Sequence, residues 1–345
     1  MQLNKEILKY TKYFLFPISL CYGIVIYCRN FLYNIGLFKS YKLPCTTISI
    51  GNLSIGGTGK TPTVIYLAEL LQKKNKKIII LSRGYGRTSR GTIILTNDNI
   101  NYTWKDVGDE PYLMSKILND VPIIVDKNRF RGGMIGIKKF NPDIILLDDG
   151  FQHRSIARDL DLCLINAKES KSDHYLIPIG VLREPWFNID RANAIILTKS
   201  NIHEPNPFLL KKIKGTNKTF IKSSFNLLNS SLHNKADLKP EKNKKIKVAI
   251  LSAIGDNSGF YNSIVKLGYE IVCEITFKDH FHYTKKTLNS IKKKILKSDS
   301  KFIITTEKDW IKIEHFNFDR EVIVVKLAIN MEPQDKLNRL LEPFL

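Results

Sequence analysis

The chain has 345 residues, enough for two packed domains, and its 43% hydrophobic and 25% charged residues exclude a disordered protein. Its 19 glycines and 13 prolines exclude a collagen-like chain, and five cysteines without a C-x-x-C pair argue against a disulfide scaffold or a zinc ribbon. The net charge is +21. Such a balance fits nucleic acid, anionic lipid or a phosphorylated substrate as partner, or a compositional drift toward Lys.

The first 40 residues differ from the rest of the chain. The segment 14–28 carries no charge and is flanked by Lys9, Lys12 and Arg29. A membrane span needs about 20 apolar residues, Pro17 interrupts this run, and no convincing signal-peptide cleavage site follows. The flanking basic and Tyr residues favour a helix in the cytoplasmic membrane interface. A buried core helix and a single span are the alternatives.

From residue 46 onward, apolar strands alternate with helical periods, which predicts βαβ units and a mainly parallel sheet. The predicted strands are 46–50, 77–82, 92–95, 122–125, 144–148, 160–165 and 194–198, with amphipathic helices over 64–71, 112–117 and 130–140. A polar stretch over 201–245, with a short strand near 219–222, is predicted to connect two domains.

A second α/β series follows that stretch. Its predicted strands are 247–252, 270–277, 302–305 and 321–327, and its predicted helices are 258–267, 284–297 and 333–341. The expected organisation is an N-terminal membrane-interface helix (1–40), a P-loop nucleotide-binding domain of the α/β class (41–215) and a smaller α/β domain (216–345).

A phosphate-binding loop follows the first predicted strand and opens a helix. Its sequence is Ser54-Ile55-Gly56-Gly57-Thr58-Gly59-Lys60-Thr61. The glycines let backbone N–H groups curl around phosphate oxygens, Lys60 can reach the β- and γ-phosphates, and the Thr61 hydroxyl is placed for Mg²⁺. Ser54 stands where the consensus has Gly, but the strand–loop–helix context still predicts nucleotide binding.

Carboxylates end another predicted strand. Asp148 and Asp149 follow a fully apolar run, where a parallel sheet would place them beside the P-loop as Mg²⁺ ligands. The alternative is an acidic turn, because Asp-Gly is a common turn signal.

Three further positions are candidates for the chemistry. Asp109 is either a helix N-cap or a general base on an acceptor hydroxyl, and His280 or His282 could join it if the domains close over a cleft. Arg183 could steady the transferring phosphoryl group, or could be a surface residue. Nine of the 12 arginines lie between Arg83 and Arg191, which favours phosphate chemistry in that segment because Lys is otherwise preferred.

Two observations weigh against other P-loop functions. The best candidate for a guanine-reading loop has Asn201 where Asp is required, which disfavours a GTPase. A P-loop nucleic-acid ATPase is the principal alternative, but the Lys excess is diffuse and has no stacking motif beside it.

Taken together, several motifs resemble the tetraacyldisaccharide 4′-kinase family. The matching stretches are residues 51–62, 81–87, 108–111, 148–153, 182–185, 279–280 and 305–309, in family order. The resemblance implies an ATP- and Mg²⁺-dependent kinase that phosphorylates the 4′-hydroxyl of a tetraacylated disaccharide 1-phosphate at the cytoplasmic face of the inner membrane. It implies neither a nucleic-acid partner nor an obligate protein partner.

The resemblance also implies roles for particular residues. Asp109 and His280 would form the base dyad, and Arg183 would face the phosphoryl group. Asp148 and Asp149 correspond to the family's paired aspartates, and Glu110, Gln152 and Glu184 would complete the metal shell. This chain departs from the family at Ile179 and Val181, which leaves the course of that loop open.

Overall fold

The computed structural model describes residues 2–97, 101–228 and 245–345, which form two compact units that interleave along the chain. Unit 1 contains Met1–Arg83, Asp126–Ser223 and Met331–Leu345, and unit 2 contains Gly84–Val125 and Ser224–Asn330. The predicted domains 41–215 and 216–345 are each continuous, whereas each compact unit takes segments from both.

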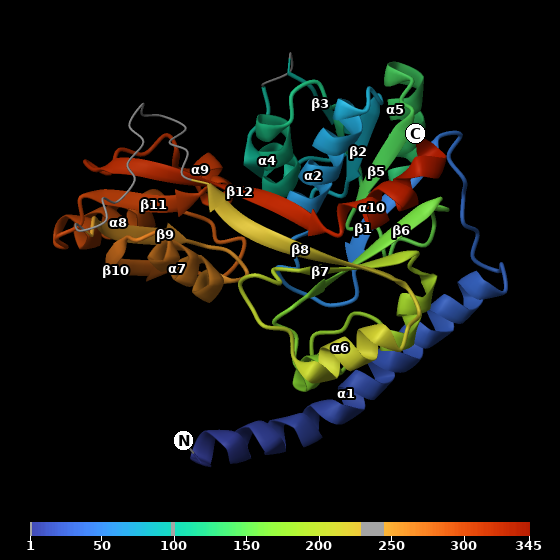
Figure 1. Cartoon of the computed structure of the whole chain (residues 1–345), viewed down its shortest axis with the longest axis horizontal. Helices are drawn as coiled ribbons and strands as arrows, with labels where there is room; N and C mark the ends of the chain where they lie inside the picture. Colours follow the sequence, from blue (N-terminus) through green and yellow to red (C-terminus); the bar gives the residue numbers. More distant parts are fainter. Residues whose placement is uncertain (1, 98–100, 229–244) are drawn as a thin grey trace. The chain divides into compact units, whose positions relative to one another are not determined.

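Unit 1 is built on a parallel sheet with the strand order β8-β7-β6-β1-β5-β2 (Figure 1). Its strands are β1 (Thr46–Asn52), β2 (Ile78–Ser82), β5 (Ile144–Asp148), β6 (Leu160–Asn166), β7 (Ala194–Thr198) and the start of β8 (Thr219–Leu228). Every residue of β2, β5 and β7 is buried, as expected of parallel strands covered on both faces. Ile50 pairs with Asp148, so β1 and β5 end side by side.

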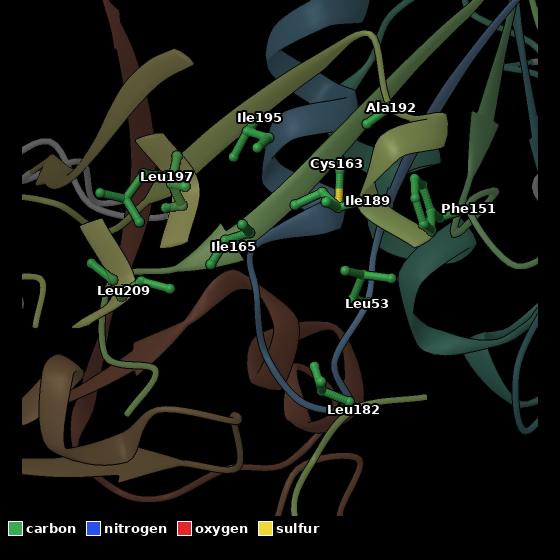
Figure 2. Close-up of a cluster of buried hydrophobic side chains, with 12 residues drawn as sticks. Leu53, Phe151, Cys163, Ile165, Leu182, Ile189, Ala192, Ile195, Leu197 and Leu209 are labelled. Atoms are coloured by element: carbon green, nitrogen blue, oxygen red, sulfur yellow. The ribbon is translucent and has the colours of Figure 1, made fainter. Parts of the chain in front are cut away.

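The sheet of unit 1 is accompanied by helices. They are α1 (Gln2–Asn34), α2 (Lys60–Lys73), α5 (Arg129–Phe140), α6 (Pro207–Lys214) and α10 (Gln334–Leu341), with 3₁₀ turns η1 (Lys171–His174), η2 (Trp186–Arg191) and η3 (Glu342–Phe344). Helix α2 buries the predicted apolar stripe of Val64, Leu67, Ala68 and Leu71. A second core, drawn in Figure 2, joins Cys163 of β6 and Ile195 of β7 to η2 and α6.

Unit 2 has its own parallel sheet in the order β10-β9-β11-β12. Its strands are β9 (Lys247–Ser252), β10 (Glu270–Thr276), β11 (Phe302–Thr306) and β12 (Glu321–Glu332), with helices α7 (Asn257–Lys266), α8 (Lys285–Leu296) and α9 (Glu307–Ile313). Alternate residues of β9 face different cores: Ala249 and Leu251 pack with α8, whereas Val248 and Ile250 pack with α7.

The segment Gly84–Val125 adds α3 (Trp104–Val107), α4 (Asp109–Ile117) and an antiparallel pair, β3 (Ile93–Leu95) and β4 (Ile123–Val125), to unit 2. Helix α4 contacts α9. The α/β class with a mainly parallel sheet, predicted from the sequence, is confirmed.

Helix α1 differs from its prediction in two ways. Pro17 lies inside a continuous helix, so the expectation that it interrupts the run is wrong for the backbone. Residues Phe14–Asn34 form a helix long and apolar enough to cross a membrane, but only 11% of that window is buried, so the buried core helix is also wrong. Hydrogen bonds from Ser19 to Leu176 and from Tyr22 to Arg183 hold one face of α1 on unit 1.

The predicted polar connection over 201–245 contains more structure than expected. It includes the whole of α6, which Asn206 caps at its N-terminus, and β8 continues to Leu228. Residues 229–244 of this connection lie outside the described part of the chain.

Candidate active site

The phosphate loop connects β1 to α2, as predicted. Gly56 and Gly59 have φ values of 111° and 86°, which a residue with a Cβ rarely adopts. The loop is held by side chains around it: Asn52 donates to the Ser54 carbonyl, Asn166 to that of Gly57 and Thr198 to that of Thr58.

Ser54 has a structural reason to replace glycine. Its hydroxyl donates to Glu169 Oε1 over 2.8 Å, and both residues are buried. Glu169 in turn lies 3.2 Å from His174. The local sequence carries no signal for Glu169, Asn166 and Thr198 as residues of this site, because each approaches the loop only through the tertiary fold.

Two cations converge on Asp149 beside the loop. Lys60 Nζ lies 3.4 Å from Asp149 Oδ1 and 3.2 Å from Asn52 Oδ1, and Arg183 Nη1 lies 3.0 Å from Asp149 Oδ2. Burial disfavours the charged form of Asp149, but Lys60 and Arg183 outweigh it, so its pKa is held below the usual value. Lys60, Asp149 and Arg183 therefore form a polar group at the P-loop, which excludes the alternative of Arg183 as an isolated surface residue.

Asp148 is buried at the end of β5. Its Oδ2 accepts a hydrogen bond from Ser82, and its carbonyl accepts one from the buried Arg129. Arg129 is another residue that the sequence analysis did not name, although it belongs to the arginine-rich segment.

The predicted metal-shell residues are distributed between the units. In unit 1, Thr61 opens α2 beside the P-loop, and Gln152 accepts from Arg183 and donates to the Asn52 carbonyl. Glu184 is fully buried, where its carboxylate accepts hydrogen bonds from Arg191 and from Asn30 of α1, and so it pairs with residues outside the Lys60 group. Glu110 belongs to unit 2, 4.0 Å from Lys308. In residues 2–97, 101–228 and 245–345, no three His, Cys, Asp or Glu side chains form a group that could hold a metal.

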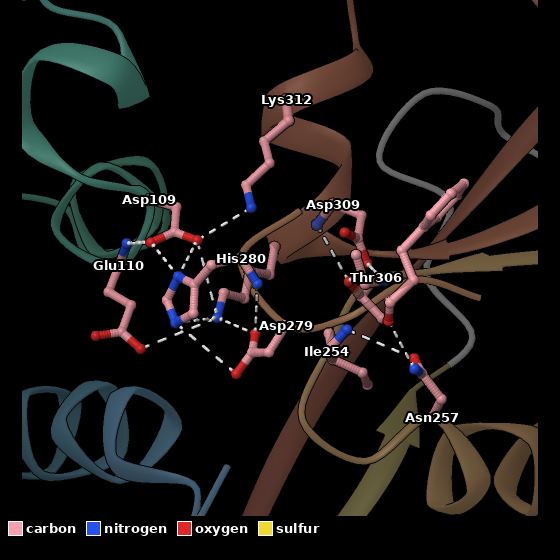
Figure 3. Close-up of polar contacts among 12 residues, drawn as sticks. Asp109, Glu110, Ile254, Asn257, Asp279, His280, Thr306, Asp309 and Lys312 are labelled. Carbon is pink, nitrogen blue, oxygen red and sulfur yellow. Dashed lines mark hydrogen bonds and ion pairs between the residues drawn. The ribbon is translucent and has the colours of Figure 1, made fainter. Parts of the chain in front are cut away.

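Unit 2 contains the Asp109–His280 pair. Asp109 is the first residue of α4, after the N-cap Gly108, so the N-cap alternative is wrong. His280 Nδ1 lies 2.8 Å from Asp109 Oδ2, whereas His282 packs against the ring of Trp104. Of the two candidate histidines, His280 is thus the one that meets Asp109 (Figure 3).

Two lysines of α9 complete this cluster. Lys312 Nζ lies 3.0 Å and Lys308 Nζ 3.8 Å from Asp109 Oδ2. Burial opposes the charge on Asp109, but the hydrogen bond with His280 and the two lysines outweigh it and hold the pKa of Asp109 well below its usual range. The hydrogen bond with Asp109 raises the pKa of His280. Lys308 lies in the family-like stretch 305–309. Lys312 lies outside that stretch, and its spacing of four residues from Lys308 on α9 is the signal that could have indicated it.

The fold and these groups define a class. A loop with two left-handed glycines, a lysine and a threonine at a helix N-terminus, beside a strand that ends in aspartates, is the arrangement of a P-loop nucleotide-binding protein. A carboxylate–imidazole pair in the same chain adds a group that can accept a proton.

Comparison with known proteins identifies the family. The sequence profile described as "Tetraacyldisaccharide-1-P 4'-kinase" matches residues 11–345, and the chain belongs to this family. It is 38% identical over 328 residues to the tetraacyldisaccharide 4′-kinase of Aquifex aeolicus, covering 95% of this chain and 97% of that protein. It is 33% identical to the protein of the same description from Desulfatibacillum aliphaticivorans, covering 94% and 90%.

A solved structure agrees with this assignment. The crystal structure of "apo" form LpxK from Aquifex aeolicus in complex with ATP has a TM-score of 0.79 and 35% identity, covering 97% of this chain and 99% of that one. The predicted family and fold class are confirmed.

Proposed function

We propose that this protein transfers the γ-phosphate of ATP to the 4′-hydroxyl of a tetraacylated disaccharide 1-phosphate. One observation carries this proposal: the chain contains both the Lys60–Asp149–Arg183 group at a P-loop and the Asp109–His280 pair. The same chain matches the 4′-kinase family over residues 11–345. The first group suits a triphosphate, and the second suits an alcohol that must lose a proton.

The chemistry divides between these groups. Phosphoryl transfer spreads negative charge over the equatorial oxygens, and Lys60 and Arg183 would stabilise that charge by electrostatic contact. Asp109, oriented by His280, would accept the proton as the sugar oxygen bonds to phosphorus and the bond to the ADP oxygen breaks. The proton would then be held within the Asp109–His280 pair.

The residues of unit 1 fit a P-loop magnesium ion. Such an ion takes most of its oxygen ligands from phosphates and water, so it needs few protein ligands. The Thr61 hydroxyl at the start of α2 and the carboxylates of Asp148 and Asp149 are the residues that would hold it. When bound, Mg²⁺ would neutralise charge on the β- and γ-phosphates. Gln152 remains a candidate, whereas the Glu184 carboxylate already pairs with Arg191.

Helix α1 supports a place at the membrane surface. Its outer face exposes Phe14 (81%), Val25 (64%) and Phe16 (58%), while Arg29 and the Lys-rich surface suit an anionic leaflet. A substrate with four acyl chains stays in a bilayer, so an interfacial helix would hold the enzyme at the headgroup level. We place the protein on the cytoplasmic face of the inner membrane.

The test is transfer of labelled phosphate from [γ-³²P]ATP to purified tetraacyl disaccharide monophosphate in mixed micelles. The wild type should form a lipid product labelled at the 4′ position, and removal of Mg²⁺ with EDTA should stop the reaction. Lys60→Ala should lose at least about 10²-fold in kcat, since the lysine contacts the transferring group. The matched control is Lys247→Ala, which removes a surface pair with Asp299 and should leave the rate unchanged.

Two results would overturn the assignment. One is a folded wild-type protein that hydrolyses ATP without labelling the lipid. The other is equal transfer by the wild type and by Lys60→Ala.

A further inference from the structure

Helix α9 presents two lysines to one carboxylate. Lys308 and Lys312 are one helical turn apart and therefore lie on the same face of α9. The Lys312 ammonium contacts Asp109 Oδ2 at 3.0 Å, and its side chain is only 1% exposed (Figure 3). A charged side chain buried to this extent is costly unless it is paired, and Asp109 is the carboxylate that pairs with it.

The contacts of Asp109 leave its carboxylate little freedom. Oδ1 accepts from the Glu110 N–H at 3.0 Å, His280 Nδ1 contacts both oxygens, and Lys312 approaches Oδ2. The whole residue is 6% exposed. Without Lys312, the contacts that would remain among the described residues are the short bonds of Asp109 with the Glu110 N–H and with His280, and the more distant Lys308.

Lys308 acts on the other member of the pair. Its ammonium lies 2.8 Å from Asp279 Oδ1, and the same Oδ1 accepts the backbone N–H of His280 at 3.0 Å. His280 has a φ of 61°, a left-handed conformation that a non-glycine residue adopts only when its surroundings hold it there. Lys308 therefore anchors the turn from which the imidazole projects.

Helix α9 is itself fixed to the sheet of unit 2. Asp309 is completely buried and accepts hydrogen bonds from the Ala253 N–H, the Tyr283 hydroxyl and the Thr306 hydroxyl. Thr306 caps the helix by accepting the Asp309 N–H. The two lysines thus extend from a backbone that these four hydrogen bonds hold in place, which suits them to position other side chains.

We infer that Lys312 and Lys308 are positioning residues for the reaction. Lys312 holds the Asp109 carboxylate, and Lys308 holds His280 through Asp279. Together they keep Asp109 and His280 in the relative positions in which this pair accepts the proton of the acceptor hydroxyl. This inference rests on the proposed function of Asp109 and His280. It assigns the two lysines to proton acceptance, and it predicts that their loss slows catalysis without weakening substrate binding.

The experiment measures steady-state kinetics with ATP and the tetraacyl disaccharide monophosphate for Lys312→Met, Lys312→Arg and Lys308→Met. Methionine keeps most of the side-chain volume and removes the charge. Lys312→Met should lower kcat by about 10²-fold, the loss typical of a misplaced catalytic group, with both KM values within about threefold of the wild type. Lys312→Arg should recover about tenfold of that loss, and Lys308→Met should lower kcat by about tenfold.

Lys247→Met is the matched control, because it removes a lysine–carboxylate pair from the surface of unit 2. It should retain wild-type kinetics. Folding of every variant is followed by circular dichroism. If Lys312→Met does not fold, the positioning role is tested by Lys312→Arg and Lys308→Met: a lowered kcat in both supports it, and wild-type kcat in both overturns it.

The outcomes separate this inference from the function on which it rests. A wild type that transfers phosphate, with folded lysine variants at wild-type kcat, overturns the positioning role alone. The same holds if the variants raise KM with kcat unchanged. A wild type that transfers no phosphate to the disaccharide overturns the proposed function itself.

Discussion

The residues that hold the phosphate loop are as informative as the loop itself. Backbone carbonyls of residues 54, 57 and 58 each accept a hydrogen bond from a side chain, and these bonds fix the conformation of the loop. Ser54 adds a side-chain link, since its hydroxyl bonds the buried Glu169 carboxylate at 2.8 Å. A serine in place of the consensus glycine therefore fastens the start of the loop.

Ser54→Ala should weaken ATP binding. Hydrogen bonds to charged groups contribute about 1.5–3 kcal/mol, and the lower part of that range corresponds to roughly a tenfold rise in the Kd for ATP. The kcat at saturating ATP should stay within about threefold, because the Lys60 group is unchanged. Calorimetric titration with a non-hydrolysable ATP analogue measures the affinity.

The control for that variant is Ser263→Ala, which removes a hydroxyl that donates to the Gly259 carbonyl within α7. It should bind ATP like the wild type. An unchanged affinity in Ser54→Ala as well would show that the Glu169 link does not shape the loop.

At the scale of single elements, the sequence predicted much of the fold. Strands over 46–50 and 144–148 are continuous apolar runs, and burial on both faces explains why such runs specify parallel strands. The helix α2 was predictable because its apolar stripe has the helical period. The course of α1 through Pro17 was not, since the ring removes one hydrogen bond but leaves the rest of a 33-residue helix intact.

The candidate site was predictable only where local sequence carries the chemistry. The P-loop, Asp109 and Asp148 each stand at an element boundary with a recognisable neighbour. Local sequence made Arg183 and either His280 or His282 candidates, and the family motifs then selected Arg183 and His280. Lys312 and Glu169 have no such signal. Each is an ordinary charged residue whose significance comes from a partner more than 100 residues away, Asp109 and Ser54 respectively.

The cysteines of the chain provide a test of α1. Cys21 and Cys28 lie exposed on this helix, whereas Cys163 and Cys273 are buried. Burial, with added repulsion from Asp143 and Asp159, raises the pKa of Cys45 to about 11. Because only the thiolate reacts, about 0.1% of Cys45 is reactive at pH 8, three pH units below that pKa. We therefore expect two fast thiols, on α1, in detergent-free protein.

Vesicles containing anionic lipid should then slow the reaction of Cys21 and Cys28 with a water-soluble thiol reagent by at least about tenfold, if α1 lies in the bilayer interface. The double variant Cys21→Ser/Cys28→Ser should lack the fast phase with and without vesicles. Equal rates for the wild type in both conditions would contradict the membrane role of α1.

On the scale of the whole molecule, the net charge of +21 suits either an anionic membrane or a nucleic acid as binding partner. Attraction to an anionic leaflet is worth about 1 kcal/mol per nearby Lys or Arg and is screened by salt, whereas burial of the apolar face of α1 is not. A nucleic-acid protein would need its charge gathered on a binding face with aromatic stacking groups. Several exposed aromatic side chains, among them Phe14, Phe16 and Phe31, lie on α1, whereas others such as Tyr85 and Phe187 lie on separate segments.

Binding to vesicles and to nucleic acid, each measured over a range of salt concentrations, distinguishes these two partners. With anionic vesicles, we expect the full chain to bind at about 0.1 M KCl and to retain part of that binding at about 1 M, because the apolar face of α1 persists when charge attraction is screened. With single- or double-stranded nucleic acid, filter binding should give only the weak, non-specific affinity of a basic protein, with a Kd in the range of about 10⁻⁴–10⁻⁶ M near physiological salt. A chain lacking residues 1–30 should lose the salt-resistant part of vesicle binding while its nucleic-acid affinity stays the same.

The contrary result is binding of nucleic acid with a nanomolar Kd near physiological salt, together with ATP hydrolysis that nucleic acid stimulates. That result would favour the nucleic-acid ATPase, and it would leave the exposed apolar face of α1 unexplained.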